Sequence, residues 1–310
     1  MPPASSFRQY TYYASWFLRS KLGMKHPLVN TMIIHYACNL RCQHCAISSS
    51  TEDIPKEGST MSFDAASREM RAEYEKGAKI LFFEGGEPTI WRDGDKGLGD
   101  LIAEGRRIGY YVIGYTTNGT GRIFEESDVL SISLDGPREV HDRIRGPGVY
   151  DKLMANLEMT DHPNIFANMV VMRPNLDKVR ETAEVVKANP RIRGLMLNFL
   201  TPPPYDISLT LEEKAQVVNE ALQLRKEKLP ILNTERALKE LLIEDYSKKC
   251  PYWVSSFTLP DGSKHYGCPM QGTESCKHCG FDAVREYRLI LAGNVQTITR
   301  MSRRFALSTR

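Results

Sequence analysis

The chain alternates between short apolar, β-branched segments and longer segments whose apolar residues recur with helical spacing. Six segments are apolar at nearly every position, which is typical of strands buried on both faces of a parallel sheet. They are residues 29–35, 78–83, 110–116, 129–134, 165–171 and 194–200. Between them the pattern predicts helices over residues 62–76, 98–107, 149–159 and 176–188. We therefore expect an α/β fold with a partial (β/α)6 TIM-like barrel, shorter than the eight units of a complete one.

The pattern changes after the sixth predicted strand. Three prolines at 202–204 interrupt the chain, and two more helices are predicted over residues 211–226 and 235–247. Beyond Cys250 the segments are short and rich in glycine, proline and cysteine. The expected organisation is an N-terminal extension (1–27), a barrel (28–229) and a small C-terminal cysteine-rich domain (230–310).

Charge distinguishes the two ends of the chain from its middle. The net charge is only +3, but no aspartate or glutamate precedes Glu52 or follows Glu286, whereas arginines occur in both stretches. Residues 5–22 predict a helix with aromatic and basic positions. Such a helix fits either the surface of a membrane or the floor of the barrel. No basic motif interleaved with aromatics indicates nucleic acid.

The expected role of the seven cysteines depends on the cellular compartment of the protein. No apolar run is long enough to span a bilayer, and the first residues lack the pattern of a signal peptide. We therefore expect a cytoplasmic protein, with peripheral contact at the inner face of the membrane as a further expectation. In that reducing compartment cysteines are expected as metal ligands or buried thiols, not as disulfides.

Three cysteines follow the first predicted strand with the spacing CxxxCxxC: Cys38, Cys42 and Cys45. In a β/α array this position lies at the end of the barrel that carries catalytic groups. Three thiolates are one ligand short of a 4Fe–4S cluster or of a structural zinc site. The loop therefore indicates either an iron–sulfur cluster with one open iron or a zinc site, for which His35 would be a fourth ligand.

The cysteine loop resembles the signature of the radical S-adenosylmethionine (radical SAM) enzymes, and "GGEP" after the second strand resembles another motif of that family. The resemblance covers roughly residues 28 to 205 and implies that S-adenosylmethionine chelates the open iron. His44 departs from the aromatic residue usual before the last cysteine. The cofactor contacts implied by the resemblance are His44, Glu84, Gly85, Gly86, Glu87, Asn118, Ser133, Asp135, Arg145 and Asn198. Among them Ser133 is expected at the ribose and Arg145 at the carboxylate.

A second group of four cysteines, Cys250, Cys268, Cys276 and Cys279, ends in CxxC. Four thiolates complete either a zinc site or a second cluster. The group resembles the SPASM or twitch extensions of radical SAM enzymes, which implies an auxiliary 4Fe–4S cluster and two clusters in all. The catalytic residues are unknown at this point, with Glu286, Tyr266 and Tyr252 as candidates.

The resemblance implies an oxygen-sensitive enzyme that reductively cleaves S-adenosylmethionine to a 5′-deoxyadenosyl radical, with a flavodoxin or ferredoxin as electron donor. That radical would functionalise an unactivated carbon. The apolar, basic termini favour a lipid or polyprenyl substrate, and a peptide or protein substrate is the alternative. A non-enzymatic iron–sulfur electron-transfer protein is the alternative from another class, but it would need neither a barrel mouth nor a GGEP segment.

Overall fold

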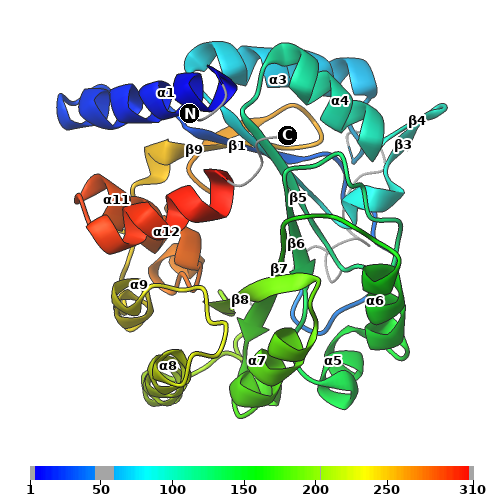
Figure 1. The fold of residues 1–310 in the computed structure, drawn as a ribbon, viewed down its shortest axis with the longest axis vertical. Helices are drawn as coiled ribbons and strands as arrows, with labels where there is room; N and C mark the ends of the chain where they lie inside the picture. The colour runs from blue at the N-terminus through cyan, green and yellow to red at the C-terminus, as the bar shows by residue number, and fades with distance from the viewer. Residues whose placement is uncertain (1–3, 46–58, 203, 307–310) are drawn as a thin grey trace.

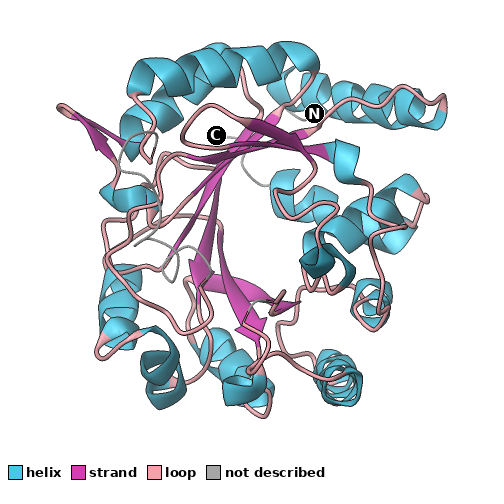
Figure 2. Ribbon diagram, turned by 180° about the vertical axis from the view of Figure 1, so that it is seen from behind, coloured by secondary structure: helices cyan, strands magenta, loops and turns pink. Residues whose placement is uncertain are grey.

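The computed structural model describes residues 4–45, 59–202 and 204–306, and gives no side-chain description for 4–6 and 303–306. A curved sheet of eight strands forms its centre, with helices on the outer side (Figure 2). The strand order is β10-β9-β1-β2-β5-β6-β7-β8. The strands are β1 (Val29–Ile33), β2 (Ile80–Glu84), β5 (Val112–Thr117), β6 (Val129–Ser133), β7 (Ile165–Val171), β8 (Ile192–Phe199), β9 (Ser255–Thr258) and β10 (Lys264–Tyr266). All neighbours pair in parallel except β9 and β10.

Helices follow the strands around the outside of the sheet (Figure 1). They are α3 (Phe63–Lys76), α4 (Leu98–Ile108), α5 (Arg138–Arg145), α6 (Val149–Glu158), α7 (Val179–Ala188) and α8 (Leu211–Lys226). The later helices α9 (Glu235–Glu240), α11 (Asp282–Leu291) and α12 (Val295–Ala306) lie in the gap between β8 and β9. Smaller elements are a hairpin of β3 (Arg92–Asp93) and β4 (Lys96–Gly97), the short helix α10 (Glu274–Lys277), and 3-10 turns at Pro88–Ile90, Arg173–Asn175 and Tyr252–Val254.

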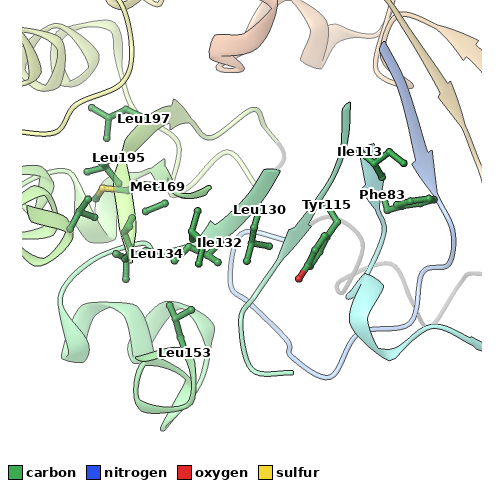
Figure 3. Packing of buried hydrophobic residues seen from close by; sticks show 14 of the residues in the cluster. Phe83, Ile113, Tyr115, Leu130, Ile132, Leu134, Leu153, Met169, Leu195 and Leu197 are labelled. Atoms are coloured by element: carbon green, nitrogen blue, oxygen red, sulfur yellow. The ribbon is translucent and has the colours of Figure 1, made fainter. Parts of the chain in front are cut away.

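The largest apolar core lies between the sheet and the outer helices. Strand residues such as Phe83, Ile113 and Leu130 are fully buried there, and Leu153 reaches the sheet from α6 (Figure 3). This packing leaves the inner side of the curved sheet free to form a cavity. The core therefore fixes the strand ends from which the candidate site is built.

The α/β fold with a partial barrel and a cysteine-rich C-terminal region is confirmed, and the six predicted strands occur with small shifts at their ends. The sequence pattern missed β9 and β10. It also extended α9 to residue 247, whereas the helix ends at Glu240. The carbonyl oxygen of Glu240 accepts a hydrogen bond from Arg285 Nε (3.2 Å), which takes an acceptor that a continuing helix would use.

The N-terminal helix α1 (Ala4–Lys21) packs its aromatic face on the floor of the barrel. Trp16 is 8% exposed, its ring lies 5.6 Å from that of Trp253, and its Nε1 donates to His26 O at 2.9 Å. Tyr12 and Tyr13 both pack edge-on against Tyr111. Trp16 and Tyr13, two of the aromatic residues that favoured a membrane-surface helix, thus pack against the barrel.

None of the described helices is long and apolar enough to cross a membrane.

If the aromatic face of α1 is part of the core, Trp16→Ala will lower the free energy of unfolding by about 3 kcal/mol, as expected for a buried large side chain. Leu18→Ala, on the same helix but 62% exposed, will change it by no more than about 0.5 kcal/mol. Urea unfolding followed by circular dichroism measures both. Equal effects of the two substitutions would mean that α1 does not support the barrel.

Candidate active site

A cavity of about 440 Å³ lies inside the curved sheet, at the carboxyl ends of the parallel strands. Thiol groups from both cysteine sets open into it, namely Cys38, Cys42, Cys45, Cys250 and Cys268. Aromatic and aliphatic side chains, including Phe82, Phe166, Met196, Phe257 and Tyr287, form much of the remaining wall. The arrangement joins two groups of potential metal ligands to one largely apolar space, as is usual for ligand sites.

The loop that carries Cys38, Cys42 and Cys45 is anchored by several neighbouring segments. Its backbone pairs with the end of β2, where Gly86 N donates to His35 O and Glu87 N to Ala37 O, both at 2.9 Å. On the other side Gln43 N donates to Ile144 O of α5 (3.0 Å). The loop is thus held between the end of β2 and helix α5.

Gly85 and Gly86 permit this close approach. A Cβ atom at Gly86 would lie 2.0 Å from Ala37 O, and one at Gly85 would lie 2.3 Å from His35 O. Gly85 also has a φ of +154°, which disfavours any side chain. Both positions therefore require glycine, and the GGEP segment acts here as a tight backbone contact with the cysteine loop.

Glu87 and Asn118 are engaged in hydrogen bonds within the protein. The buried carboxylate of Glu87 accepts from Thr117 Oγ1 and from Asn118 N, both at 2.7 Å. The side chain of Asn118 donates to Asn39 Oδ1 of the cysteine loop at 2.9 Å. These contacts tie the ends of β2 and β5 to the loop, so both side chains position the site.

The thiol groups are held in an environment that disfavours their charged form. Burial raises the pKa of Cys42 to about 11, although Arg145 opposes this, and burial likewise raises the pKa of Cys38. Burial and the neighbouring thiols raise the pKa of Cys250 to about 12. Thiolates in these positions need a compensating cation, and metal binding would release their protons.

A buried ion pair stands beside the first cysteine set. Asp135 Oδ2 accepts from Arg145 Nε at 2.7 Å, and Asp135 Oδ1 accepts from Val170 N at 2.9 Å. Arg145 Nη1 lies 3.8 Å from Cys42 Sγ. Burial alone would raise the pKa of Asp135, but Arg145 and His44 outweigh it and lower that pKa. Asp135 is therefore a carboxylate that holds Arg145 against the cysteine loop.

His44 is the residue of the loop with an unused polar atom. Its ring lies in the cavity wall, and its Nδ1 is buried without a hydrogen-bond partner among the described residues. Burial lowers the pKa of His44 to about 4, so the ring is neutral at neutral pH. An atom of this kind, together with three thiols that line the same cavity and the glycine contact, fits a site for a polar cofactor bound beside a metal cluster.

The second cysteine set lies across the cavity from these strand ends and is attached to β8. Gly280 N donates to Thr201 Oγ1 (2.9 Å), and Phe199 N donates to Gly280 O (3.0 Å). Asn198 Oδ1 accepts from Asp282 N at 2.7 Å. No three histidine, cysteine or carboxylate side chains in the described ranges are already gathered around a single metal position.

The structure brings most of the predicted site residues together. All of the expected cofactor contacts except Asp135 line the cavity, as do Glu286 and Tyr252. Cys276 and Cys279 do not line the cavity, but both are close enough to Cys250 to raise its pKa. Tyr266, at the end of β10, does not line the cavity: it is 45% exposed, and its hydroxyl accepts from Lys76 Nζ of α3 at 2.7 Å.

Sequence reasoning missed the apolar wall of the cavity. Phe82 and Glu84 on β2, Ser131 and Ser133 on β6, and Met196 and Asn198 on β8 are pairs two residues apart that line it. Side chains two positions apart on a strand lie on the same face. The residue two positions before each predicted cofactor contact could therefore have been predicted, from the sequence alone, to line the same cavity.

The model of the radical SAM superfamily matches residues 32–186. The mycofactocin maturase MftC of Mycolicibacterium smegmatis is 33% identical over 178 residues, which cover 52% of this chain and 42% of that protein. The structure of anSMEcpe with bound S-adenosylmethionine has a TM-score of 0.63 at 18% identity, covering 80% of this chain and 76% of that one. SuiB of Streptococcus suis bound to its precursor peptide SuiA has a TM-score of 0.60 at 14% identity, covering 89% and 69%.

The chain therefore belongs to the radical SAM superfamily and is a radical SAM enzyme. Membership implies a 4Fe–4S cluster and S-adenosylmethionine as cofactors. The described cysteine loop and cavity fit that chemistry. The aligned segment spans 42% of the length of the mycobacterial relative.

The buried pair beside the cysteine loop generates a prediction. Asp135→Asn leaves the guanidinium of Arg145 without its carboxylate and should cost about 3–5 kcal/mol of stability. The matched control is Asp151→Asn, which breaks the exposed pair with Arg138 and should cost less than about 1 kcal/mol. Chemical denaturation of both variants measures the difference. Similar losses would show that Asp135 does not hold Arg145 as described.

Proposed function

We propose that this enzyme modifies a peptide or protein substrate by radical chemistry in the cavity between its two cysteine sets. The observation that carries the proposal is that thiols of both sets open into the same largely apolar space. A substrate side chain in that space would lie between the S-adenosylmethionine site and the second set. The cavity walls would exclude water from a reactive carbon radical.

In this proposal Cys38, Cys42 and Cys45 ligate the cluster that binds S-adenosylmethionine. When bound, this pair of cofactors supplies a 5′-deoxyadenosyl radical that removes hydrogen from an unactivated carbon. The backbone at Gly85 and Gly86, the ring of His44, Ser133 and the guanidinium of Arg145 are the contacts proposed for S-adenosylmethionine. Glu87, Asn118 and Asp135 position these groups.

Cys250, Cys268, Cys276 and Cys279 are proposed to hold an auxiliary 4Fe–4S cluster, although zinc would also suit four thiolates. Glu286 and Tyr252 line the cavity near this set and are candidate substrate contacts. Glu84 joins them, because burial raises the pKa of its carboxyl group in the cavity wall. A flavodoxin or ferredoxin is the proposed electron donor.

A peptide substrate is better supported than a lipid. The mycobacterial relative is named as a maturase, and the SuiB structure contains a precursor peptide. The aromatic residues of α1 that favoured a lipid are packed against the barrel floor. The cavity is compatible with an apolar side chain of a peptide, because Phe82, Phe166 and Met196 form part of its wall.

The proposal predicts the iron content and the first reaction step. Anaerobically reconstituted enzyme should hold about eight irons, and the combined Cys38→Ala, Cys42→Ala and Cys45→Ala variant about four. With dithionite and S-adenosylmethionine, the wild type should form 5′-deoxyadenosine and Cys42→Ala none. Cys250→Ala is the matched control, which should lose the second cluster and keep this cleavage. Zinc in place of half the iron would contradict the auxiliary cluster.

The substrate class is tested in the same assay. A pool of short synthetic peptides should increase 5′-deoxyadenosine formation and should yield peptides of altered mass. A polar-lipid extract should do neither. Stimulation by the lipid extract alone would reject the peptide proposal and leave the radical chemistry intact.

A peripheral contact of α1 with an anionic membrane is a separate proposal. The helix face opposite the barrel exposes Phe7 (67%), Tyr10 (47%) and Leu18 (62%). Arg8, Arg19 and Lys21 are also exposed, and the sequence has no acid before Glu52. An apolar stripe flanked only by cations is complementary to acyl chains beneath anionic headgroups. Arg303 and Arg304 of the basic tail have no described side chains, and Arg310 lies outside the described residues.

Vesicles containing phosphatidylserine should therefore co-sediment the protein at low salt and release it at high salt, since each basic residue contributes about 1 kcal/mol. Leu18→Glu should abolish binding. Met159→Glu, at a residue 77% exposed on another surface, should leave it unchanged. A wild-type protein that stays in the supernatant with these vesicles would disprove the contact.

A further inference from the structure

Arg285 is a fully buried arginine on α11 that faces the second cysteine set. Its Nη1 lies 3.9 Å from Cys279 Sγ, and its Nη2 donates to Cys279 O at 2.6 Å. Two further carbonyl groups accept from it, Phe281 O at 2.8 Å and Glu240 O at 3.2 Å. The guanidinium thus links the segment that contains Cys279 to the end of α9 by hydrogen bonds.

The positive charge of Arg285 is stabilised mainly by the dipoles of backbone carbonyl groups. The acceptors named above are backbone carbonyls, and the ring of Tyr246 lies 4.1 Å from its guanidinium carbon. The carboxylate of Glu240, which is close by, is taken by Arg288 and by the hydroxyl of Tyr246. Arg145 at the first cysteine set differs, because Asp135 pairs with it directly.

Burying an arginine is costly unless its hydrogen bonds are satisfied and its charge is compensated. Thiolates in the second set would supply that compensation. Lys214 adds a second cation, since Arg285 and Cys279 both act on its pKa, which burial lowers. Arg285 and Lys214 are therefore two cationic side chains near Cys279 in the protein interior.

We propose that Arg285 is a positioning residue that raises the reduction potential of a 4Fe–4S cluster at the second cysteine set. The inference rests on the auxiliary cluster in the proposed function. Reduction adds one electron and makes the cluster more negative, so a fixed cation near a ligand sulfur stabilises the reduced form. The hydrogen bond to Cys279 Sγ acts in the same direction, because it withdraws charge from the sulfur.

The consequence is a difference between the two cysteine sets. At the first set, Arg145 is paired with the carboxylate of Asp135. At the second set, the contacts described for Arg285 are with backbone carbonyl groups, a sulfur and an aromatic ring. The second cluster should therefore accept an electron more readily than the same cluster would without Arg285. Such a cluster suits the removal of one electron from a substrate radical in the shared cavity, with the electron then passed to an external acceptor protein.

The test is a redox titration followed by electron paramagnetic resonance. The full chain carrying Cys38→Ala, Cys42→Ala and Cys45→Ala isolates the second cluster. In that background Arg285→Met should make reduction at least tenfold less favourable, which is about 59 mV for a one-electron couple. Arg288→Met is the matched control, one turn along α11 and paired with Glu240; it should shift the potential much less.

The outcomes separate the inference from the proposed function. If the background variant with Arg285 intact holds no iron, the auxiliary cluster itself is disproved. If Arg285→Met retains about four irons and matches Arg288→Met in potential, the role of Arg285 is disproved. If Arg285→Met fails to retain iron, the potential of Arg285→Lys is measured instead. Lysine keeps the positive charge but lacks the planar guanidinium that donates several hydrogen bonds. A potential near the wild-type value in Arg285→Lys supports the charge effect, and a potential lower by about 59 mV or more overturns it.

Discussion

The site depends on one close contact between two backbones, that of Gly85 and Gly86 against the residues following β1. The parallel pairing of β1 and β2 brings the ends of these strands level, and the absence of side chains at the two glycines lets the following segments touch. Any Cβ atom at Gly86 would overlap Ala37 O and push the loop away. Because Cys38 is the next residue in that loop, its sulfur would move with it. The position of the cysteines is thus set by a contact that involves none of their own atoms.

The two cysteine sets are built by different means. The first is a loop fastened to strand ends by Glu87, Asn118 and the Asp135–Arg145 pair. The second has few regular elements, and its attachment to the barrel passes through Gly280 and the residues that end β8. A Cβ at Gly280 would lie 2.0 Å from Phe199 O, so glycine is required there as well. In both sets, a glycine next to a cysteine region allows two segments distant in sequence to lie against each other.

The barrel could be predicted because its strands are buried on both faces and are apolar at nearly every position. The cysteine loop could be predicted because its spacing and its place after a strand are both local features. Strand β9 could not, since its sequence "SSFT" is short and polar at three of its four positions, and its pairing with β1 is a tertiary effect. The helical pattern of α1 gave two usable faces without showing which one the barrel covers. Asp135 was expected at the cofactor, but its pairing with Arg145 depends on the fold of α5 over the strand end.

The parallel pairing of β9 with β1 has a consequence for how the chain reaches this state. Val29 of β1 is bonded into the same ladder as Ser255, more than two hundred residues later. During synthesis the outer edge of β1 stays uncovered until more than two hundred further residues have been added to the chain. An exposed edge strand invites pairing with other chains, and contacts of such long sequence separation form slowly. Aggregation of nascent chains through this edge is therefore a hazard when the protein is produced in cells.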